Sequence, residues 1–296
     1  MSTLGPEGLA ELDRMVEEAL GRGDERGLRV LGYGEISLVL GWPAEEPVFA
    51  CKRLPAFPDR ARFDAYGETL ADYVASLGEA GVEVVPTEFE AVGRSDGRVV
   101  GYAVQPALDP STLGPAVLAA GEPSEGHPLV EALIEAAART VNPRRGLDAQ
   151  LSNWVWETGG RLRYLDVTTP MLWSAGGDLR LDLDLLVQPL PAALRPPVRR
   201  FLGPKILDSY RDLREVMEDV CGNLLKERLE AWLPAFLAAA NRHLSEPLGE
   251  QEVRRYYRSD ARLWEFLLRV RKLDRAWQQR VRRRPYPYLL PGRVQR

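Results

Sequence analysis

The sequence predicts an α+β protein with a small β-rich N-terminal part and a larger, mainly helical C-terminal part. Three observations favour this class: strand candidates dominate residues 28–105, helical periodicity dominates after Pro197, and one hairpin lies between these segments. The 296 residues are 45% hydrophobic and 28% charged with a net charge of −4, a composition that excludes a mainly disordered chain.

Other sequence features bear on where the protein works. No uncharged apolar run approaches the ~18 residues that a membrane-spanning helix needs. Residues 1–13 have neither the basic start nor the apolar stretch of a secretory signal. Cys51 and Cys221 are too few for a disulfide framework and fit no metal-ligand spacing. We therefore expect a cytoplasmic protein.

The N-terminal part contains two predicted helices and four predicted strands. Apolar residues at helical spacing followed by Gly21 indicate the first helix. A connection with Gly41, Pro43 and Pro47 is typical of a hairpin, and residues 95–97 are a turn signal between the last two strands. In order, we predict a helix over 6–20, strands over 28–40 and 48–54, a helix over 59–78, and strands over 87–92 and 99–105.

The C-terminal part begins with a proline- and glycine-rich run, residues 107–126, which predicts a linker. A short hairpin follows further along the chain, and its turn signal is Thr158-Gly159-Gly160. In order, we predict a helix over 129–141, strands over 151–157 and 162–167, and helices over 204–220, 223–243 and 249–283.

A glycine-containing segment, residues 32–37, lies in the first strand region. Gly32 and Gly34 let the backbone approach phosphate oxygens closely, and the Ser37 hydroxyl could donate a further hydrogen bond. By itself, the segment is more typical of a bulged strand.

Lys52 lies inside an otherwise apolar strand. Burying a lysine is costly unless the side chain meets an anion. Glu68, about two turns into the next predicted helix, could be that anion. The alternative is that Lys52 reaches solvent from an edge strand.

Acidic and amide side chains flank the short hairpin. Asp148 and Asn153 form an Asp-x4-Asn loop before it, and Asp166 ends its second strand. Carboxylate and amide oxygens suit Mg²⁺ held together with nucleotide phosphates. Taken singly, Asp166 is equally typical of a turn or a helix cap.

Taken together and in this order, these segments resemble the protein-kinase-like superfamily, above all its small-molecule phosphotransferases of the aminoglycoside and choline type. The resemblance covers residues 28–243 and implies a bilobal fold. The implied N-lobe spans residues 1–106 and the C-lobe residues 107–248, with a basic C-terminal helix and tail over 249–296.

The resemblance also implies ligands and roles. ATP and Mg²⁺ are the implied cofactors, and a small-molecule hydroxyl is the implied phosphate acceptor. Asp148 would be the catalytic residue, and Asn153 and Asp166 would bind the metal. The implied nucleotide-binding residues are Gly32, Gly34 and Ser37 in the glycine loop, Lys52 with its helix partner Glu68, and a hinge from Gln105 to Leu108 that would hold adenine.

Departures from the family pattern leave a pseudokinase open as an alternative. Ser37 replaces the third glycine, and Gly146 stands where a histidine or arginine usually braces the catalytic loop. Trp154 and Trp156 are candidates to brace that loop, and plain core packing is their alternative role. In the pseudokinase reading, the chain binds nucleotide and regulates a partner.

The C-terminal segment 254–296 is strongly basic. It holds 14 Lys or Arg and three acids, a net charge of +11, so residues 1–253 carry −15. An apolar stripe beside these basic residues makes residues 254–284 a candidate membrane-surface helix. The alternative is that the tail packs against the acidic body. Sequence-specific nucleic-acid binding is not expected, because no helix-turn-helix or zinc-finger signature is present.

Overall fold

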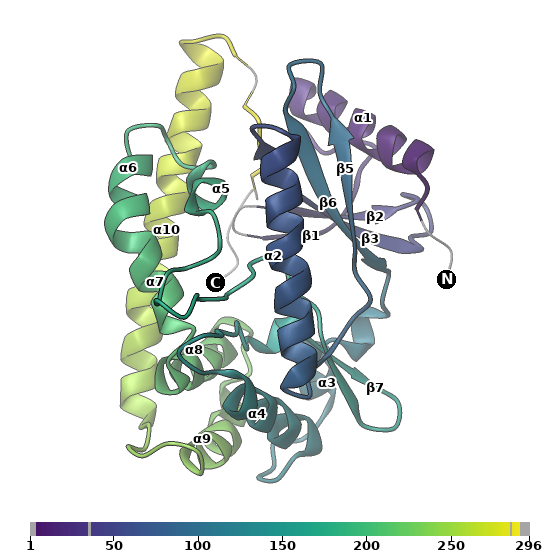
Figure 1. Cartoon of the computed structure of the whole chain (residues 1–296). Coiled ribbons are helices and arrows are strands. Elements are labelled where there is room, and N and C mark those ends of the chain that lie inside the picture. The colour runs from purple at the N-terminus through teal and green to yellow at the C-terminus, as the bar shows by residue number, and fades with distance from the viewer. Residues whose placement is uncertain (1–3, 35–36, 285, 291–296) are drawn as a thin grey trace.

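The structure is a computed structural model that describes residues 4–34, 37–284 and 286–290. The fold is mixed α+β, as predicted. A five-stranded antiparallel sheet with a helix on either side forms one region, and helices with a three-stranded sheet form the other (Figure 1).

The five-stranded sheet has the order β1-β2-β3-β6-β5, and every neighbouring pair is antiparallel. Its central strand β3 therefore carries Lys52 between β2 and β6. The predicted strand over 28–40 is two strands that pair antiparallel with each other. The strands are β1 (Arg29–Tyr33), β2 (Leu38–Trp42), β3 (Phe49–Phe57), β5 (Glu88–Gly93) and β6 (Val99–Pro106).

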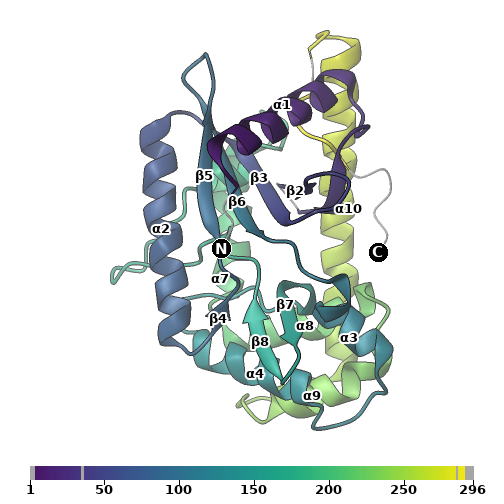
Figure 2. The ribbon, with the colours of Figure 1, turned by 90° about the vertical axis from the view of Figure 1, so that its right-hand side faces the viewer.

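Helices α1 (Pro6–Arg22) and α2 (Arg60–Glu79) lie on opposite sides of this sheet (Figures 1 and 2). The apolar face of α1 packs on the sheet in a separate small core that includes Leu12 and Leu40. The face of α2 that contains Tyr66 and Tyr73 belongs to the main core, which continues into the helical region. This shared core fixes α2 beside the loops that follow the short hairpin.

The three-stranded sheet has the order β4-β8-β7 and consists of β4 (Glu83–Val84), β7 (Trp154–Glu157) and β8 (Arg161–Tyr164). Strands β7 and β8 are the predicted hairpin. Its turn requires glycine, because Gly159 and Gly160 have φ angles of 88° and 81°. The strands are shorter than predicted, so the residues flanking the hairpin are loops that can carry a site.

Beyond Pro106 the chain is mainly helical. The predicted linker contains a helix, α3 (Gly114–Ala120). The predicted helix over 223–243 is interrupted after Lys226, and the predicted helix over 204–220 is two helices. Asp212 starts a new helix there, because its side chain accepts hydrogen bonds from the backbone N–H groups of Arg214 and Glu215. The helices are α3 (Gly114–Ala120), α4 (Pro128–Thr140), α5 (Leu183–Val187), α6 (Arg195–Pro197), α7 (Gly203–Ser209), α8 (Leu213–Lys226), α9 (Leu233–Asn241) and α10 (Glu250–Arg280), and a π-helical turn, Val198–Leu202, joins α6 to α7.

Helix α10 is the longest element and runs along one side of both regions (Figures 1 and 2). It packs against α8, and Leu267 contacts a small apolar cluster with Val187 and Leu190. None of the described helices combines the length and the apolar character that a membrane crossing needs.

Candidate functional site

The centre of the candidate site is an ion pair between strand β3 and the loop after β8. Lys52 Nζ lies 2.7 Å from Asp166 Oδ1 and 2.8 Å from Asp166 Oδ2. The two side chains are 19% and 28% exposed, so water screens the pair only partly. Lys52 therefore meets an anion, as expected of a lysine in an apolar strand, but the anion is Asp166.

Two neighbours hold the Asp166 loop in place. Thr168 donates to Asp166 Oδ1 through its hydroxyl at 2.8 Å and through its backbone N–H at 3.2 Å. The Tyr66 hydroxyl on α2 donates to the Thr168 carbonyl oxygen at 2.5 Å. Burial of Asp166 favours its neutral form, but Lys52 and the Thr168 donors outweigh that effect and lower the pKa of Asp166.

The Asp148 loop is tied to the same place by hydrogen bonds through the hairpin. Asn153 Nδ2 and the Tyr164 hydroxyl each donate to the Asp148 carbonyl oxygen at 3.1 Å. The backbone N–H of Leu165, which directly precedes Asp166, donates to the Asn153 carbonyl oxygen at 2.8 Å. The structure thus brings Asp148, Asn153 and Asp166 together although they are spread over the loop and hairpin.

Aromatic side chains brace the Asp148 loop. The indole N–H of Trp154 donates to the Ala149 carbonyl oxygen at 3.2 Å, and its buried ring meets the Tyr164 ring edge-on at 5.0 Å. The Tyr73 hydroxyl on α2 donates to the Gly146 carbonyl oxygen at 3.1 Å. Trp154 is therefore one of the braces.

Its neighbour Trp156 has a different role. The Trp156 side chain is half-buried and packs at the edge of the main core. Its ring lies beside Gly160 in the hairpin turn. Of the two tryptophans considered as loop braces, Trp156 is thus a core residue.

A buried carboxylate, Asp219 on α8, lies near the half-buried Asp148. Gln150 Nε2 donates to Asp219 Oδ2 at 3.2 Å, and the Tyr256 hydroxyl on α10 donates to Asp219 Oδ1 at 2.7 Å. Burial raises the pKa of both carboxyls, and the negative charges of Asp219 and Asp166 raise that of Asp148 further. Asp148 is thereby poised to accept a proton.

Asp219 was not predicted as a site residue from the sequence. One sequence feature could have indicated it: Asp219 and Asn223 are polar residues four positions apart on a helix face that is otherwise formed by apolar residues such as Val216 and Val220. A polar pair on an apolar face indicates buried hydrogen bonding. In the structure, Asn223 Nδ2 donates to the Asp219 carbonyl oxygen at 2.9 Å.

The predicted ion pair between Lys52 and Glu68 is wrong. Glu68 is exposed on α2, and within the described residues Lys52 is paired with Asp166 instead. Successive helix residues are rotated by ~100°, so Glu68 lies ~200° from the inward-facing Tyr66. The position that faces the Asp166 loop is occupied by Tyr66, which contributes a hydroxyl donor in place of a carboxylate.

The segment expected to be a hinge, Gln105 to Leu108, does leave the sheet for the helical region. The Gln105 amide donates to the Leu165 carbonyl oxygen and to the Thr87 hydroxyl, each at 2.9 Å. The Ala107 N–H donates to the Val48 carbonyl oxygen at 2.8 Å. Gln105 therefore fixes the residue before Asp166, and Leu108 is half-buried.

Of the glycine segment, residues 32–37, residues 35–36 lie outside the part of the chain that the structure describes. The β1–β2 register shifts between Val30 and Gly32, which is the bulged strand considered above. The Gly34 N–H donates to the Ser37 carbonyl oxygen at 3.0 Å. Gly34 and Ser37 also line a small cavity of about 30 Å³ together with Arg53 and the C-terminal residues 287–289.

Most of these residues lie within one family match. A profile described as a family of unknown function, DUF6206, matches residues 11–275. The chain belongs to the DUF6206 family. The match contains Lys52, Asp148, Asn153 and Asp166, as well as Asp219. No curated protein shows significant similarity to this DUF6206 chain.

The DUF6206 chain offers few protein ligands for a metal. Within the described residues, no three His, Cys, Asp or Glu side chains are grouped to hold an ion. Mg²⁺, however, is commonly held by one or two protein oxygens together with substrate phosphates and water. The Asn153 amide and the Asp166 carboxylate carry oxygens of that kind, and the hydrogen bond from Leu165 N–H to the Asn153 carbonyl oxygen holds the backbone of the two loops side by side. These two residues fit a shared Mg²⁺.

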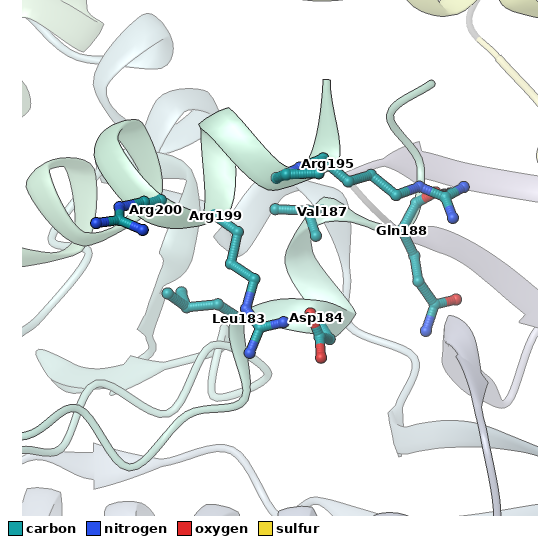
Figure 3. A pocket seen from close by; sticks show the side chains of 8 residues that line it. Leu183, Asp184, Val187, Gln188, Arg195, Arg199 and Arg200 are labelled. Atoms are coloured by element: carbon teal, nitrogen blue, oxygen red, sulfur yellow. Dashed lines mark hydrogen bonds and ion pairs between the residues drawn. The ribbon is translucent and has the colours of Figure 1, made fainter. Parts of the chain in front are cut away.

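A separate cavity of about 520 Å³ lies between α5 and the α6 region of the DUF6206 chain (Figure 3). Figure 3 shows its three arginines pointing in different directions. Arg199 pairs with Asp184 at 2.9 Å, and Arg195 donates to the Gln188 carbonyl oxygen at 2.8 Å. Because the arginines do not converge, the cavity is not an obvious anion site. Its lining residues are Leu183, Asp184, Val187, Gln188, Arg195, Pro196, Arg199 and Arg200.

Proposed function

We propose that this chain is an ATP- and Mg²⁺-dependent phosphotransferase with a bilobal protein-kinase-like fold, and that it phosphorylates a hydroxyl group of a small molecule. The single observation that carries the proposal is the Lys52–Asp166 ion pair. It joins a lysine on the third strand of the sheet to an aspartate that follows a hairpin, beside an Asp-x4-Asn loop. A phosphate-binding lysine and a metal-binding aspartate need that proximity.

The arrangement of the two regions supports the bilobal fold. Residues up to Pro106 form the five-stranded sheet with α1 and α2, except for β4, which pairs with β8 in the other region. The helices after Pro106 make up most of that second region. Lys52 comes from the first region, and Asp148, Asn153 and Asp166 come from the second. A ligand contacting all four side chains would lie between the two regions.

The proposed reaction is direct transfer. The acceptor oxygen forms a bond to the γ-phosphorus of ATP while the bond from that phosphorus to the bridging β–γ oxygen breaks, and ADP leaves. Asp148 accepts the hydroxyl proton as the new bond forms. Its raised pKa suits this role, because a carboxylate with an ordinary pKa is a weak base at neutral pH.

Lys52 and Asp166 change partners when nucleotide binds. Without nucleotide, each neutralises the charge of the other across their 2.7 Å contact. With nucleotide, Lys52 pairs with phosphate oxygens, while Asp166 and Asn153 hold Mg²⁺. When bound, the metal offsets the negative charge of the phosphates. The protein's own contribution is chiefly positioning, through the hydrogen-bonded loops around Asp148 and Asp166.

The second candidate function is a nucleotide-binding pseudokinase that regulates a partner. The observation that favours it is the exposed position of Glu68, which leaves the Lys52 side chain without the helix partner that active protein kinases use. The two candidates share nucleotide binding and differ in turnover. A chain that binds Mg²⁺–ATP and never produces ADP or a phosphorylated acceptor would be a pseudokinase.

Calorimetry of Mg²⁺–ATP binding tests the shared part. The Asp166→Ala chain should bind Mg²⁺–ATP much more weakly than the wild type, because it lacks the metal-binding carboxylate. The Asp178→Ala chain loses an exposed turn carboxylate and is the matched control, with wild-type affinity expected. Equal affinities in all three chains would reject Asp166 as a metal ligand. Thermal unfolding of each variant establishes that it is folded.

Turnover tests the remaining part. Asp148→Asn keeps the shape of the side chain and removes the proton acceptor. Mg²⁺–ATP binding should survive, and phosphoryl transfer or ADP release should fall by about 10²–10⁴-fold, the usual contribution of a general base. Unchanged transfer would show that Asp148 is not the base. ADP release to water is a usable readout before the acceptor is identified.

A further inference from the structure

One side of helix α10 exposes large apolar side chains. Phe266, Leu273 and Trp277 are 55%, 71% and 50% exposed, and Val281 directly after the helix is 65% exposed. Leu267, which lies ~100° round the helix axis from Phe266, is only 8% exposed and packs on the protein. The helix therefore has a buried apolar side and a second, exposed apolar side.

These exposed residues form a continuous stripe. At ~100° per residue, Phe266, Leu273 and Trp277 lie within ~40° of one another around the helix axis, and Val281 is ~40° further round. They are four of the eight large apolar side chains that are exposed in the described part of the chain. Half of the exposed apolar groups are thus gathered on one helix face. Such a concentration indicates an interaction surface.

Arginines flank the same stripe. Arg262, Arg269 and Arg280 lie within ~60° of Phe266 by the same helical geometry, and all three are exposed. Arg269 also forms an exposed ion pair with Glu265 at 3.3 Å. Residues 262–284 hold nine Lys or Arg and two acids, a net charge of +7. The surface around the apolar stripe is therefore strongly positive.

The positive charge of this surface indicates which kind of partner binds there. Two copies of α10 facing each other would bring two segments of charge +7 together, so their repulsion opposes self-association. An anionic bilayer offers the complementary arrangement, because aromatic and aliphatic side chains enter the acyl boundary while arginines meet lipid phosphates. We propose that the stripe of Phe266, Leu273, Trp277 and Val281, with Arg262, Arg269 and Arg280, docks on an anionic lipid bilayer.

Vesicle co-sedimentation of the full chain tests this proposal. The chain should pellet with phosphatidylcholine vesicles that contain phosphatidylserine and stay in solution with phosphatidylcholine alone. A triple substitution of Arg262, Arg269 and Arg280 to Gln should weaken binding by about 100-fold, from ~1 kcal/mol per basic residue near the surface. The matched control changes Arg14, Arg60 and Arg98 to Gln, which are exposed arginines elsewhere with the same effect on net charge.

The apolar side chains of the stripe are tested separately from the flanking arginines. Leu273→Asn combined with Trp277→Ser should abolish pelleting, while Leu31→Asn combined with Val48→Ser removes comparable exposed apolar groups elsewhere and should leave it intact. In addition, vesicles should shift the tryptophan emission of the wild type to shorter wavelength, and Trp277→Phe should remove that shift.

Three results would overturn the proposal. The first is that the wild-type chain stays in solution with anionic vesicles, whether or not it binds duplex DNA. Another is equal loss of vesicle binding in both arginine triple variants, which would mean that binding follows net charge and not this surface. The third is a dimer in sedimentation velocity that the Leu273→Asn/Trp277→Ser chain no longer forms.

Discussion

Lys52 and Asp166 are 114 residues apart in the sequence, and the ammonium group of one donates to both carboxylate oxygens of the other. This pair is the principal side-chain link between strand β3 and the loop after β8. The chemistry proposed above depends on it, because the same two side chains would separate to bind phosphate and metal.

A double-mutant cycle measures this link. Lys52→Met and Asp166→Asn should each destabilise the protein, and the two together should cost less than their sum. The expected coupling free energy is about 1–3 kcal/mol, because the pair is largely shielded from water. The exposed Arg180–Asp72 pair is the matched control, with a coupling below about 1 kcal/mol. Equal coupling in both cycles would contradict the shielded geometry, and urea unfolding provides the free energies.

The aromatic brace of the Asp148 loop gives a second prediction. Trp154→Phe removes the indole donor to the Ala149 carbonyl oxygen and should cost about 1 kcal/mol for the lost hydrogen bond. It should also lower phosphoryl-transfer turnover, because the loop that carries Asp148 loosens. Trp156→Phe is the control with the same change of side chain and wild-type turnover. If both variants lose turnover equally, Trp154 is only a core residue.

The helix that faces the Asp166 loop gives a third prediction. Glu68→Gln should leave both stability and Mg²⁺–ATP affinity unchanged, because Glu68 is exposed. Tyr66→Phe removes the hydroxyl that donates to the Thr168 carbonyl oxygen and should destabilise the protein by about 1 kcal/mol. Weakened nucleotide binding in Glu68→Gln would instead mean that α2 rotates to present Glu68 in the complex.

Two carboxylates, the buried Asp219 and the half-buried Asp148, predict an unusual dependence on pH. Folding raises the pKa of both, so the folded state binds their protons more tightly than the unfolded state, whose aspartates titrate near ~3.9. The contribution of these two groups to the free energy of unfolding is therefore largest at low pH. It falls as the pH rises from ~4 through the raised pKa values.

Asp219→Asn tests that dependence. The substitution removes one titrating group and its repulsion of Asp148, so the fall in stability with rising pH should become smaller, as measured by urea unfolding across the pH range. The pKa of Asp148 should also decrease, and the acid limb of a turnover–pH profile should move to lower pH. Asp178→Asn, at an exposed carboxylate, should leave both curves as in the wild type.

The attachment of α1 gives the last prediction. Asp13 lies on the buried face of α1, is 1% exposed, and accepts hydrogen bonds from Arg94 and from the Tyr102 hydroxyl, the latter at 2.7 Å. Asp13→Ala leaves buried donors without their acceptor and should cost about 3 kcal/mol. Asp64→Ala removes an exposed helix ion pair and should cost about 0.5 kcal/mol or less. Similar losses in thermal melts would contradict the buried position of Asp13.

Most of the fold was predictable because it depends on local patterns. The apolar strand segments with the turn signals between them, the periodicity of α2 and the glycines of the β7–β8 turn are all visible in the sequence. The last long helix, predicted over 249–283, is α10 (Glu250–Arg280). The helix boundaries between 204 and 243 were not predictable, because apolar periodicity continues across 204–220 while the Asp212 cap starts a new helix within it. Capping depends on one side chain, and a periodic pattern does not reveal it.

The candidate site was predictable to the extent that it follows chain order. Asp148, Asn153 and Asp166 are close in sequence and joined by a hairpin, so their proximity follows from the turn. Glu68 was chosen by its distance along the chain, whereas the rotation of α2 turns it to solvent and places Tyr66 inward. Asp219 meets Asp148 only through packing of α8, a tertiary contact that no local spacing encodes.

A crystal structure of the wild-type chain with Mg²⁺ and a non-hydrolysable ATP analogue tests the proposed phosphotransferase site directly. We expect one metal ion at about 2.0–2.1 Å from side-chain oxygens of both Asn153 and Asp166, with Lys52 Nζ moved from Asp166 to a phosphate oxygen. A nucleotide bound elsewhere, or bound while the Lys52–Asp166 pair stays intact, would contradict it.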